Sequence, residues 1–167
     1  MSEDKKKTIY LICLGLLIGL FLKLFVVDVL HVAGTSMVPA IKDGDRLIVN
    51  KLAYGIVKPY GEKLLVQWSE PKRDDIIIYL YNNKIVVKRC VATAGETLAY
   101  SDDSVYTLIV GEKHIPLNET QWQNLKGIDS VPAGHILAIG DNYGESVDSR
   151  NYGFVSVRTV LGKVICR

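Results

Sequence analysis

Cysteine is scarce in this sequence, and neither sign of charge is in clear excess. The three cysteines, Cys13, Cys90 and Cys166, lie far apart and form no Cys-x-x-Cys pair. They exclude a dense disulfide framework and give no zinc-site pattern. Lys and Arg number 20 against 18 Asp and Glu, a formal net charge of +2. This near balance argues against a dedicated nucleic-acid-binding protein.

The chain is also too short for several enzyme architectures. With 167 residues, it cannot hold an α/β barrel or a dinucleotide-binding domain with a separate substrate domain. Hydrophobic residues make up 49% and charged residues 23%, a balance that excludes a disordered chain. One folded domain with a short appendage is therefore expected.

What the chain does contain is a long apolar run near its N-terminus. From Thr8 to Val27 the only charged residue is Lys23, and this length is about enough to cross a ~30 Å hydrocarbon core as a helix. The run follows Lys5–Lys7, a cluster of the kind that stays on the cytoplasmic side. We predict a cytoplasmic basic tail, a single-pass transmembrane anchor helix and an extracytoplasmic domain, at residues 1–7, 8–29 and 30–167 respectively.

Two other interpretations of this run remain open. A cleaved signal peptide has the same basic start and apolar stretch, and a buried helix of a soluble protein is also apolar. The segment His31–Thr35 offers no clean small-x-small cleavage site directly at the end of the run. A run this long is also unusual for a core helix. An uncleaved anchor is therefore preferred.

The rest of the chain has the pattern of a mainly β domain. Short runs rich in β-branched and aromatic residues alternate with turn signals. Asn82-Asn83 separates two such runs, and asparagine tolerates the positive φ of a tight hairpin. Many short strands of this kind indicate a β-sandwich or an open barrel. Strands are expected at 46–50, 64–68, 75–81, 84–92, 105–110, 113–117, 135–139, 154–157 and 160–165, and a short helix at 120–126.

Ser36 is the first candidate for chemistry. A lone serine is usually a solvated loop residue or a helix cap. This one follows the predicted anchor almost directly, which places it close to the membrane surface. It is flanked by Gly34 and Pro39 and by other small or apolar residues, as expected where a substrate backbone approaches closely.

Lys88 is the second candidate, because it lies inside an apolar strand. In simple alternation it shares a face with Val86 and Cys90, while Arg89 shares the other face with further apolar residues. One of the two cations must then face an apolar surface. Both could instead lie at a sheet edge and protect it from aggregation. If Lys88 is buried, desolvation lowers its pKa until the neutral amine can act as a base.

The segment Gly140–Arg150 is the third candidate, with three acids, two glycines, two serines and an arginine. It could simply be a polar loop of Asx-turns. The acidic spacing does not match an EF-hand calcium loop. Asp148 and Arg150 are spaced so that they can pair with each other and order the loop.

Taken in order, these segments resemble the bacterial type I signal peptidases, membrane-anchored serine proteases that remove signal peptides from exported proteins. The resemblance spans the whole chain. Each piece is weak by itself, but their order and spacing are specific. The matching pieces are the anchor, Ser36-Met37 with Pro39, Gly44-Asp45, Lys88-Arg89, Gly95-Glu96, Gly140–Asn142, Ser146, Asp148–Arg150 and Gly153–Val155.

The resemblance implies a mainly β fold, a catalytic domain of coiled antiparallel sheets shared with self-cleaving repressors, carrying one N-terminal transmembrane helix. It also implies a Ser–Lys dyad, a variant of the serine-protease triad. In it, Ser36 is the nucleophile and Lys88 the general base. The family uses no metal or organic cofactor. The supporting residues implied are Ser146, which hydrogen-bonds the lysine, the ion pair Asp148–Arg150, and Asp141 as a further acid.

The implied substrate is an exported preprotein with small residues, typically Ala-x-Ala, before the cut. We expect Val32, Met37 and Val86 to form walls of the pockets that select those side chains. The Ser36 backbone N–H would be one donor to the oxyanion. In some family members a serine side chain supplies the other donor, at the position occupied here by Gly34. Tyr143 stands where many members carry an arginine.

Three alternatives to this assignment remain. A self-cleaving repressor also uses Ser and Lys, but would carry a DNA-binding domain where this chain has its apolar run. A eukaryotic-type signal peptidase would carry His at the position of Lys88. A catalytically silent, membrane-anchored module that binds signal peptides would give no reaction with an acylating inhibitor.

Overall fold

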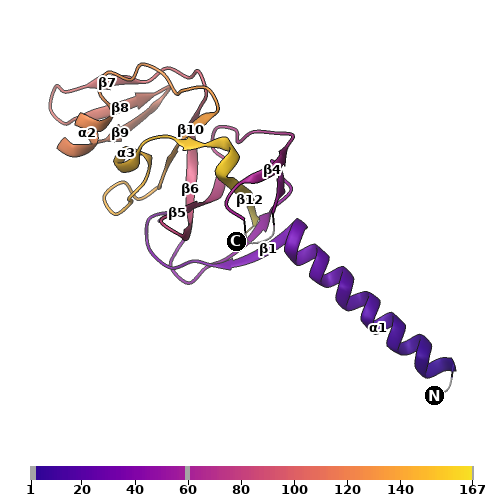
Figure 1. Ribbon diagram of the computed structural model, residues 1–167. Coiled ribbons are helices and arrows are strands. Elements are labelled where there is room, and N and C mark those ends of the chain that lie inside the picture. The colour runs from indigo at the N-terminus through magenta and orange to yellow at the C-terminus, as the bar shows by residue number, and fades with distance from the viewer. Residues whose placement is uncertain (1–2, 59–60, 167) are drawn as a thin grey trace.

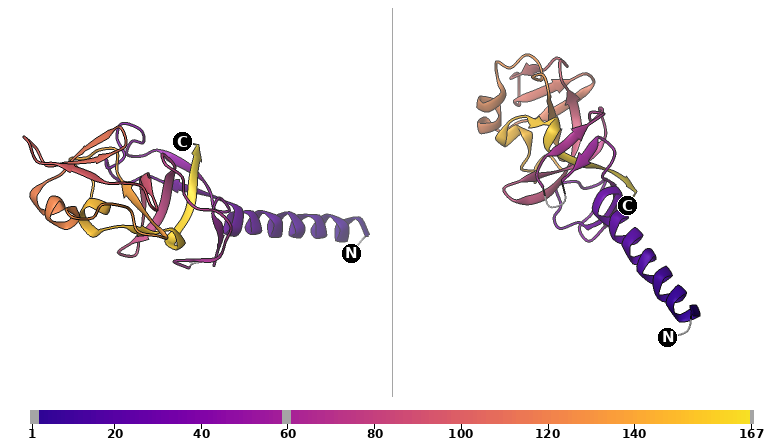
Figure 2. Two further views of the ribbon diagram at one scale, coloured as in Figure 1. Left: turned by 90° about the horizontal axis from the view of Figure 1, so that it is seen from above. Right: turned by 45° about the vertical axis from the view of Figure 1, so that its right-hand side comes forward.

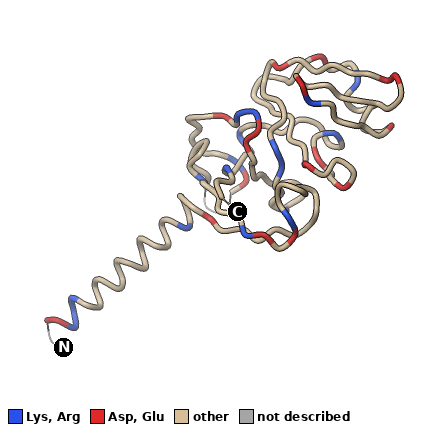
Figure 3. The backbone as a smooth tube through the Cα atoms, turned by 180° about the vertical axis from the view of Figure 1, so that it is seen from behind, with Lys and Arg blue, Asp and Glu red and all other residues tan. Residues whose placement is uncertain are grey.

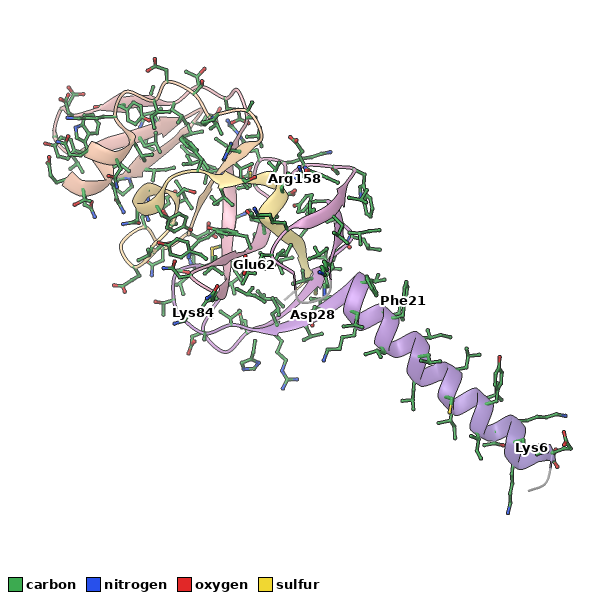
Figure 4. All side chains as sticks on the ribbon, viewed as in Figure 1. Lys6, Phe21, Asp28, Glu62, Lys84 and Arg158 are labelled. Atoms are coloured by element: carbon green, nitrogen blue, oxygen red, sulfur yellow. The ribbon has the colours of Figure 1, made fainter. Side chains whose placement is uncertain are left out.

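The computed structural model describes residues 3–58 and 61–166. A long N-terminal helical segment leads into a β-rich body (Figure 1). It consists of α1 (Glu3–Phe21) and a π-helical turn, η1 (Leu22–Val26). These 24 residues are apolar enough to cross a membrane, and the apolar window is not buried inside the protein. At 1.5 Å per residue the segment is about 36 Å long, and its side chains project on all sides (Figure 4).

The helical segment ends before the predicted limit of the anchor at residue 29. After Val26 the chain enters β1 (Val27–His31), which pairs antiparallel with β2 (Arg46–Asn50). Lys51 donates hydrogen bonds to two carbonyl groups at the end of the helical segment. Its backbone N–H donates to the Val26 carbonyl at 2.9 Å, and its Nζ donates to the Leu24 carbonyl at 2.7 Å. Strand pairing and these two bonds terminate the helix, so residues 27–29 belong to the sheet. The outermost predicted limits, 1 and 167, lie outside the described residues.

One seven-stranded antiparallel sheet forms the centre of the body, in the order β1-β2-β12-β5-β6-β10-β11. The two views in Figure 2 show the helix leaving one end of the β-rich body. This arrangement confirms the mainly β fold with antiparallel sheets. Besides β1 and β2, its strands are β5 (Ile76–Tyr81), β6 (Lys84–Thr93), β10 (His135–Ile139), β11 (Val155–Ser156) and β12 (Val160–Cys166).

Two smaller sheets complete the structure. One is a two-stranded antiparallel sheet formed by β3 (Gly55–Val57) and β4 (Leu64–Gln67). At the end of the body farthest from α1, a three-stranded sheet packs with a short helix (Figure 1). Their shared apolar cluster includes Leu108, Ile115 and Leu125. These elements are β7 (Ala99–Ser101), β8 (Thr107–Val110), β9 (Lys113–Pro116) and α2 (Glu119–Leu125).

The hairpin of β5 and β6 places the central lysine. Asn82 and Asn83 adopt φ values of 49° and 60°, the left-handed conformation of a two-residue turn. The resulting register sets Lys88 opposite Ile77. Each strand expected from the sequence is present with small shifts at its ends, and so is the helix expected at 120–126. The expectations did not include β1, β3, β7 or the single-turn α3 (Ser149–Tyr152).

Candidate active site

Ser36 and Lys88 meet although 52 residues separate them in the chain. Nζ of Lys88 lies 2.7 Å from Oγ of Ser36 and donates a hydrogen bond to it. Lys88 comes from β6, and Ser36 from the loop between β1 and β2. The Lys88 side chain is buried, with only 4% of the residue exposed. The structure thus places a hydroxyl and an amine at the distance that proton transfer requires.

Burial sets the protonation of the lysine. Desolvation of the buried ammonium lowers the pKa of Lys88 below the ordinary lysine value. The Asp148 carboxylate opposes this by raising the pKa, and the Arg150 guanidinium lowers it further. Burial is the largest of the three effects, since removing a charge from water disfavours the charged form. The neutral amine, which is the form that accepts a proton, therefore becomes accessible below the usual pH range of lysine.

The loop that carries Ser36 is fixed to the segment after β10. The Asn142 backbone N–H donates to the Ser36 carbonyl at 3.0 Å, and Nδ2 of Asn142 donates to the Thr35 carbonyl at 3.2 Å. Gly140 allows this approach, because a Cβ there would collide with Oγ of Ser146 and the carbonyl oxygen of Ser36. No individual role was predicted for Gly140 or Asn142 from the sequence. A glycine directly after a buried strand is nevertheless a signal that two backbones approach closely.

The predicted pair of Asp148 and Arg150 lies completely inside the protein, with 0% and 1% of each residue exposed. The carboxylate accepts two bonds from the guanidinium, both at 2.9 Å. It also accepts the backbone N–H of Gly140 at 3.0 Å. Arg150 further donates to the carbonyls of Tyr143 and Ser146. The pair thus connects α3, the end of β10 and the loop between them.

The Ser146 hydroxyl is buried, but it is not bonded to Lys88 as predicted. Its Oγ has no hydrogen-bond partner among the described residues. The hydroxyl lies against Gly140, beside the Ser36 backbone. A buried hydroxyl without a partner carries a desolvation cost of roughly 1–3 kcal/mol. The hydroxyl therefore has a free donor and a free acceptor on the Gly140 side of the Ser36 backbone.

Asp141 forms an ion pair with Arg89, the residue next to Lys88 in β6. Its carboxylate accepts two bonds from the Arg89 guanidinium, both at 2.7 Å. Arg89 also donates to the Asp74 carbonyl at 3.1 Å. The two cations of β6 therefore have different environments: Arg89 is paired at the surface, and Lys88 is buried.

A cleft of about 160 Å³ opens beside the Ser36 hydroxyl and the Lys88 amine. Val32, Met37 and Val86, the predicted wall residues, all line it together with the two candidate catalytic side chains. Met37 is itself almost fully buried, at 2% exposed, and packs with Ile41 and Leu47.

Gly34 and Tyr143, the two departures noted in the sequence, both have structural roles. Gly34 has φ near 115°. Its N–H donates to the Asp43 carboxylate at 2.8 Å and is therefore not free to donate to another acceptor. The Arg150 guanidinium lies 5.5 Å from the centre of the Tyr143 ring, a cation–π distance. Among the described residues no group of three His, Cys, Asp or Glu side chains could hold a metal ion.

The family model described as "Signal peptidase, peptidase S26" matches residues 5–167. Signal peptidase I of Bacillus caldolyticus is 33% identical over 157 residues, covering 86% of this chain and 80% of the relative. Signal peptidase I T of Bacillus subtilis is 31% identical, covering 96% and 86% respectively.

An inactive relative and a solved structure are also similar to this chain. Inactive signal peptidase IA of Staphylococcus aureus is 26% identical over 98% of this chain and 92% of its own. The structure of a signal peptidase I from Enterococcus faecalis aligns with a TM-score of 0.42 and 27% identity, covering 58% of this chain and 98% of that one.

The chain is therefore a serine peptidase of mainly antiparallel β structure with an apolar N-terminal helix. It belongs to the signal peptidase family, peptidase S26. Membership of this family together with the apolar helix supports anchoring in a membrane.

Asp148→Ala should lower stability strongly. It leaves the buried Arg150 guanidinium without its counter-charge, which costs about 3–5 kcal/mol in comparable pairs. Thermal unfolding in detergent measures this. Lys113→Ala, which removes one partner of the more exposed Lys113–Asp74 pair, is the matched control and should cost at most about 1 kcal/mol. Equal melting temperatures for Asp148→Ala and the wild type would contradict this role.

Proposed function

We propose that this protein is a membrane-anchored endopeptidase that removes signal peptides from exported preproteins, with Ser36 as nucleophile and Lys88 as general base. The observation that carries the proposal is the 2.7 Å contact between the Ser36 hydroxyl and the buried Lys88 amine. A serine hydroxyl is a weak nucleophile until an adjacent base takes its proton, and a lysine kept neutral by burial is such a base.

The reaction follows from this contact. Oγ of Ser36 attacks the carbonyl carbon of the scissile bond while Nζ of Lys88 takes the hydroxyl proton. The tetrahedral intermediate collapses, the C–N bond breaks, and Lys88 returns the proton to the leaving amine. Water then attacks the acyl-enzyme ester with Lys88 again accepting a proton, and Ser36 is released with its proton restored.

The environment of the site supports the charges that form during this reaction. The Ser36 backbone N–H donates no hydrogen bond to any of the described residues and serves as one oxyanion donor. Such a donor is worth about 3–4 kcal/mol in comparable sites. Because the Gly34 N–H donates to the Asp43 carboxylate, we assign the second oxyanion donor to water or to another backbone group.

The small cleft supports selection of small side chains. A volume of about 160 Å³ suits methyl-sized groups on either side of a substrate residue, as in an Ala-x-Ala sequence. Val32, Met37 and Val86 bound this space. Met37 is almost fully buried, and the close packing of a core resists movement of this wall.

We also propose the orientation of the chain in the membrane. The basic cluster Lys5–Lys7 stays on the cytoplasmic side, and the domain after Val26 lies on the other side. Ser36 is ten positions beyond the end of the helix, so the nucleophile stands near the membrane surface where a signal peptide ends. The substrate and enzyme are thereby confined to the same layer, which raises their effective concentration.

A second function, a silent module that binds signal peptides, is kept because one relative carries the name Inactive signal peptidase IA. Family membership alone therefore does not decide between the two. The contact between Ser36 and Lys88 favours the active form, and the experiments below separate the two functions.

Ser36→Ala and Lys88→Met should each abolish cleavage of a preprotein with an Ala-x-Ala site. Each removes one partner of the proton transfer, and losses of about 10³-fold or more follow removal of such groups. Cleavage in detergent is followed by gel and by mass of the product. Lys84→Met, an exposed lysine of the same strand, is the control and should cleave normally. Wild-type turnover by Lys88→Met would reject the dyad. An inert wild type that also resists an acylating inhibitor would support the silent module.

The turnover rate should rise with pH. Only the neutral amine of Lys88 accepts the serine proton, so the active fraction increases as pH rises through the pKa of Lys88. Because burial lowers that pKa, the midpoint should lie below the ordinary lysine value of 10.5. A pH profile of kcat measures it, with melting temperatures recorded over the same range. A profile that stays flat up to pH 10 would count against lysine as the base.

Ser146→Ala tests whether the unpartnered hydroxyl positions Lys88. We expect kcat to fall by roughly 100-fold, as for a small misplacement of a catalytic group, with KM little changed. Any bond that the hydroxyl accepts from the Lys88 ammonium during turnover is lost in this variant, so the midpoint of the pH profile should move down. The melting temperature should not fall, since the hydroxyl is unpartnered in the resting protein. Unchanged kcat and midpoint would refute a positioning role.

A further inference from the structure

A second cavity lies where the N-terminal helical segment meets the β-sheet body. Its volume is about 520 Å³. Lys23, Lys51 and Lys58 line it, and Asp28 is the one acid among the described residues that do so. In Figure 4 Asp28 lies at the junction between the helix and the body. The cavity is therefore positively charged.

The charges of these lysines are not neutralised by the described part of the chain. None of the three forms an ion pair there. Lys51 donates to a neutral group, the Leu24 carbonyl, and Asp28 accepts the backbone N–H of Val29. Both Lys23 and Lys58 are exposed. Three positive charges around one hollow attract an anion.

Apart from Asn83, the remaining described walls of the cavity are apolar or glycine. They come from the end of the helix and from strands of the main sheet, and include Leu24, Leu30, Ile78, Leu80 and Ile85. A small hydrated anion gains nothing from such walls. A ligand with an anionic head and a hydrocarbon tail matches both parts of the cavity.

With α1 in a membrane, the cavity would lie at the level of the membrane interface. Lys23 is in the last turn of the helical segment, and Figure 3 shows basic residues at both ends of this helix. The neighbouring β4 ribbon exposes Leu65 and Val66, followed by Trp68, each more than half exposed. Tryptophan is enriched at membrane–water interfaces. The surface beside the cavity thus has the character of a membrane contact.

We propose that this cavity binds one anionic glycerophospholipid of the surrounding bilayer. Its phosphate lies among Lys23, Lys51 and Lys58, and an acyl chain lies along the apolar wall. The proposal rests on the membrane insertion of α1 and not on the peptidase chemistry. Leu30 and Ile85 also line the catalytic cleft, so the bound lipid shares a wall with the site of cleavage and holds the cleft at a fixed level against the bilayer.

The test is a titration of the full-length chain, in an uncharged detergent, with dioctanoyl-phosphatidylglycerol, read by native mass spectrometry. The wild type should bind one molecule in preference to dioctanoyl-phosphatidylcholine. In Lys23→Gln/Lys58→Gln the dissociation constant should rise about fivefold for each lysine, roughly 25-fold in all. Lys51 is kept, because it also bonds to the end of the helix. Lys23→Arg/Lys58→Arg should bind as the wild type does.

The matched control is Lys42→Gln/Lys126→Gln, which removes two exposed lysines that do not line the cavity and should not alter binding. Equal weakening in both Gln variants would overturn the site, because net charge alone would explain binding. Equal affinity for the two lipids, or competition by soluble glycerol phosphate at the same affinity, would also overturn it. Preprotein cleavage by the wild type keeps the two proposals separate. A wild type that cleaves the preprotein but does not prefer the anionic lipid refutes this site alone, and a wild type that binds the lipid but does not cleave refutes the peptidase alone.

Discussion

The burial of one amine next to one hydroxyl is the constraint on which the rest of this structure depends. An ammonium in an apolar environment is unfavourable, so Lys88 can be neutral only where water is excluded. Its partner Ser36 must nevertheless remain open to a peptide. The fold meets both demands by placing Lys88 in a central strand and Ser36 in a loop at the rim of the cleft. The apolar packing of β6 and the accessibility of the loop thus serve the same contact.

A loop can hold such a contact only if other parts of the chain hold the loop. Here the segment after β10 does so, through backbone bonds from Asn142 and the close approach at Gly140. That segment is in turn held by the buried pair of Asp148 and Arg150. The contact between Ser36 and Lys88 is therefore supported from a third region of the sequence that supplies neither of these two side chains. Precision of this kind is what catalytic geometry requires.

Much of this arrangement could be predicted from the sequence. Alternation and turn residues identify most strands, since the hairpin at Asn82-Asn83 is a local feature. The pairing of Asp148 with Arg150 is local too. The burial of Lys88, by contrast, depends on which strands flank β6, and spacing alone leaves an exposed edge equally possible. The end of the helix at Val26 depends on Lys51, 25 residues farther on, and the free hydroxyl of Ser146 depends on the packing of three loops.

The two bonds from Lys51 to the end of the helix have a mechanical consequence. They join the end of the helical segment to Lys51, the residue directly after β2, which pairs with β1, so the helix cannot rotate against the sheet without breaking them. Under the proposed function, this connection sets the height above the bilayer at which Ser36 meets a peptide. The position of a bond relative to the membrane would then select the cleavage site in addition to the neighbouring side chains.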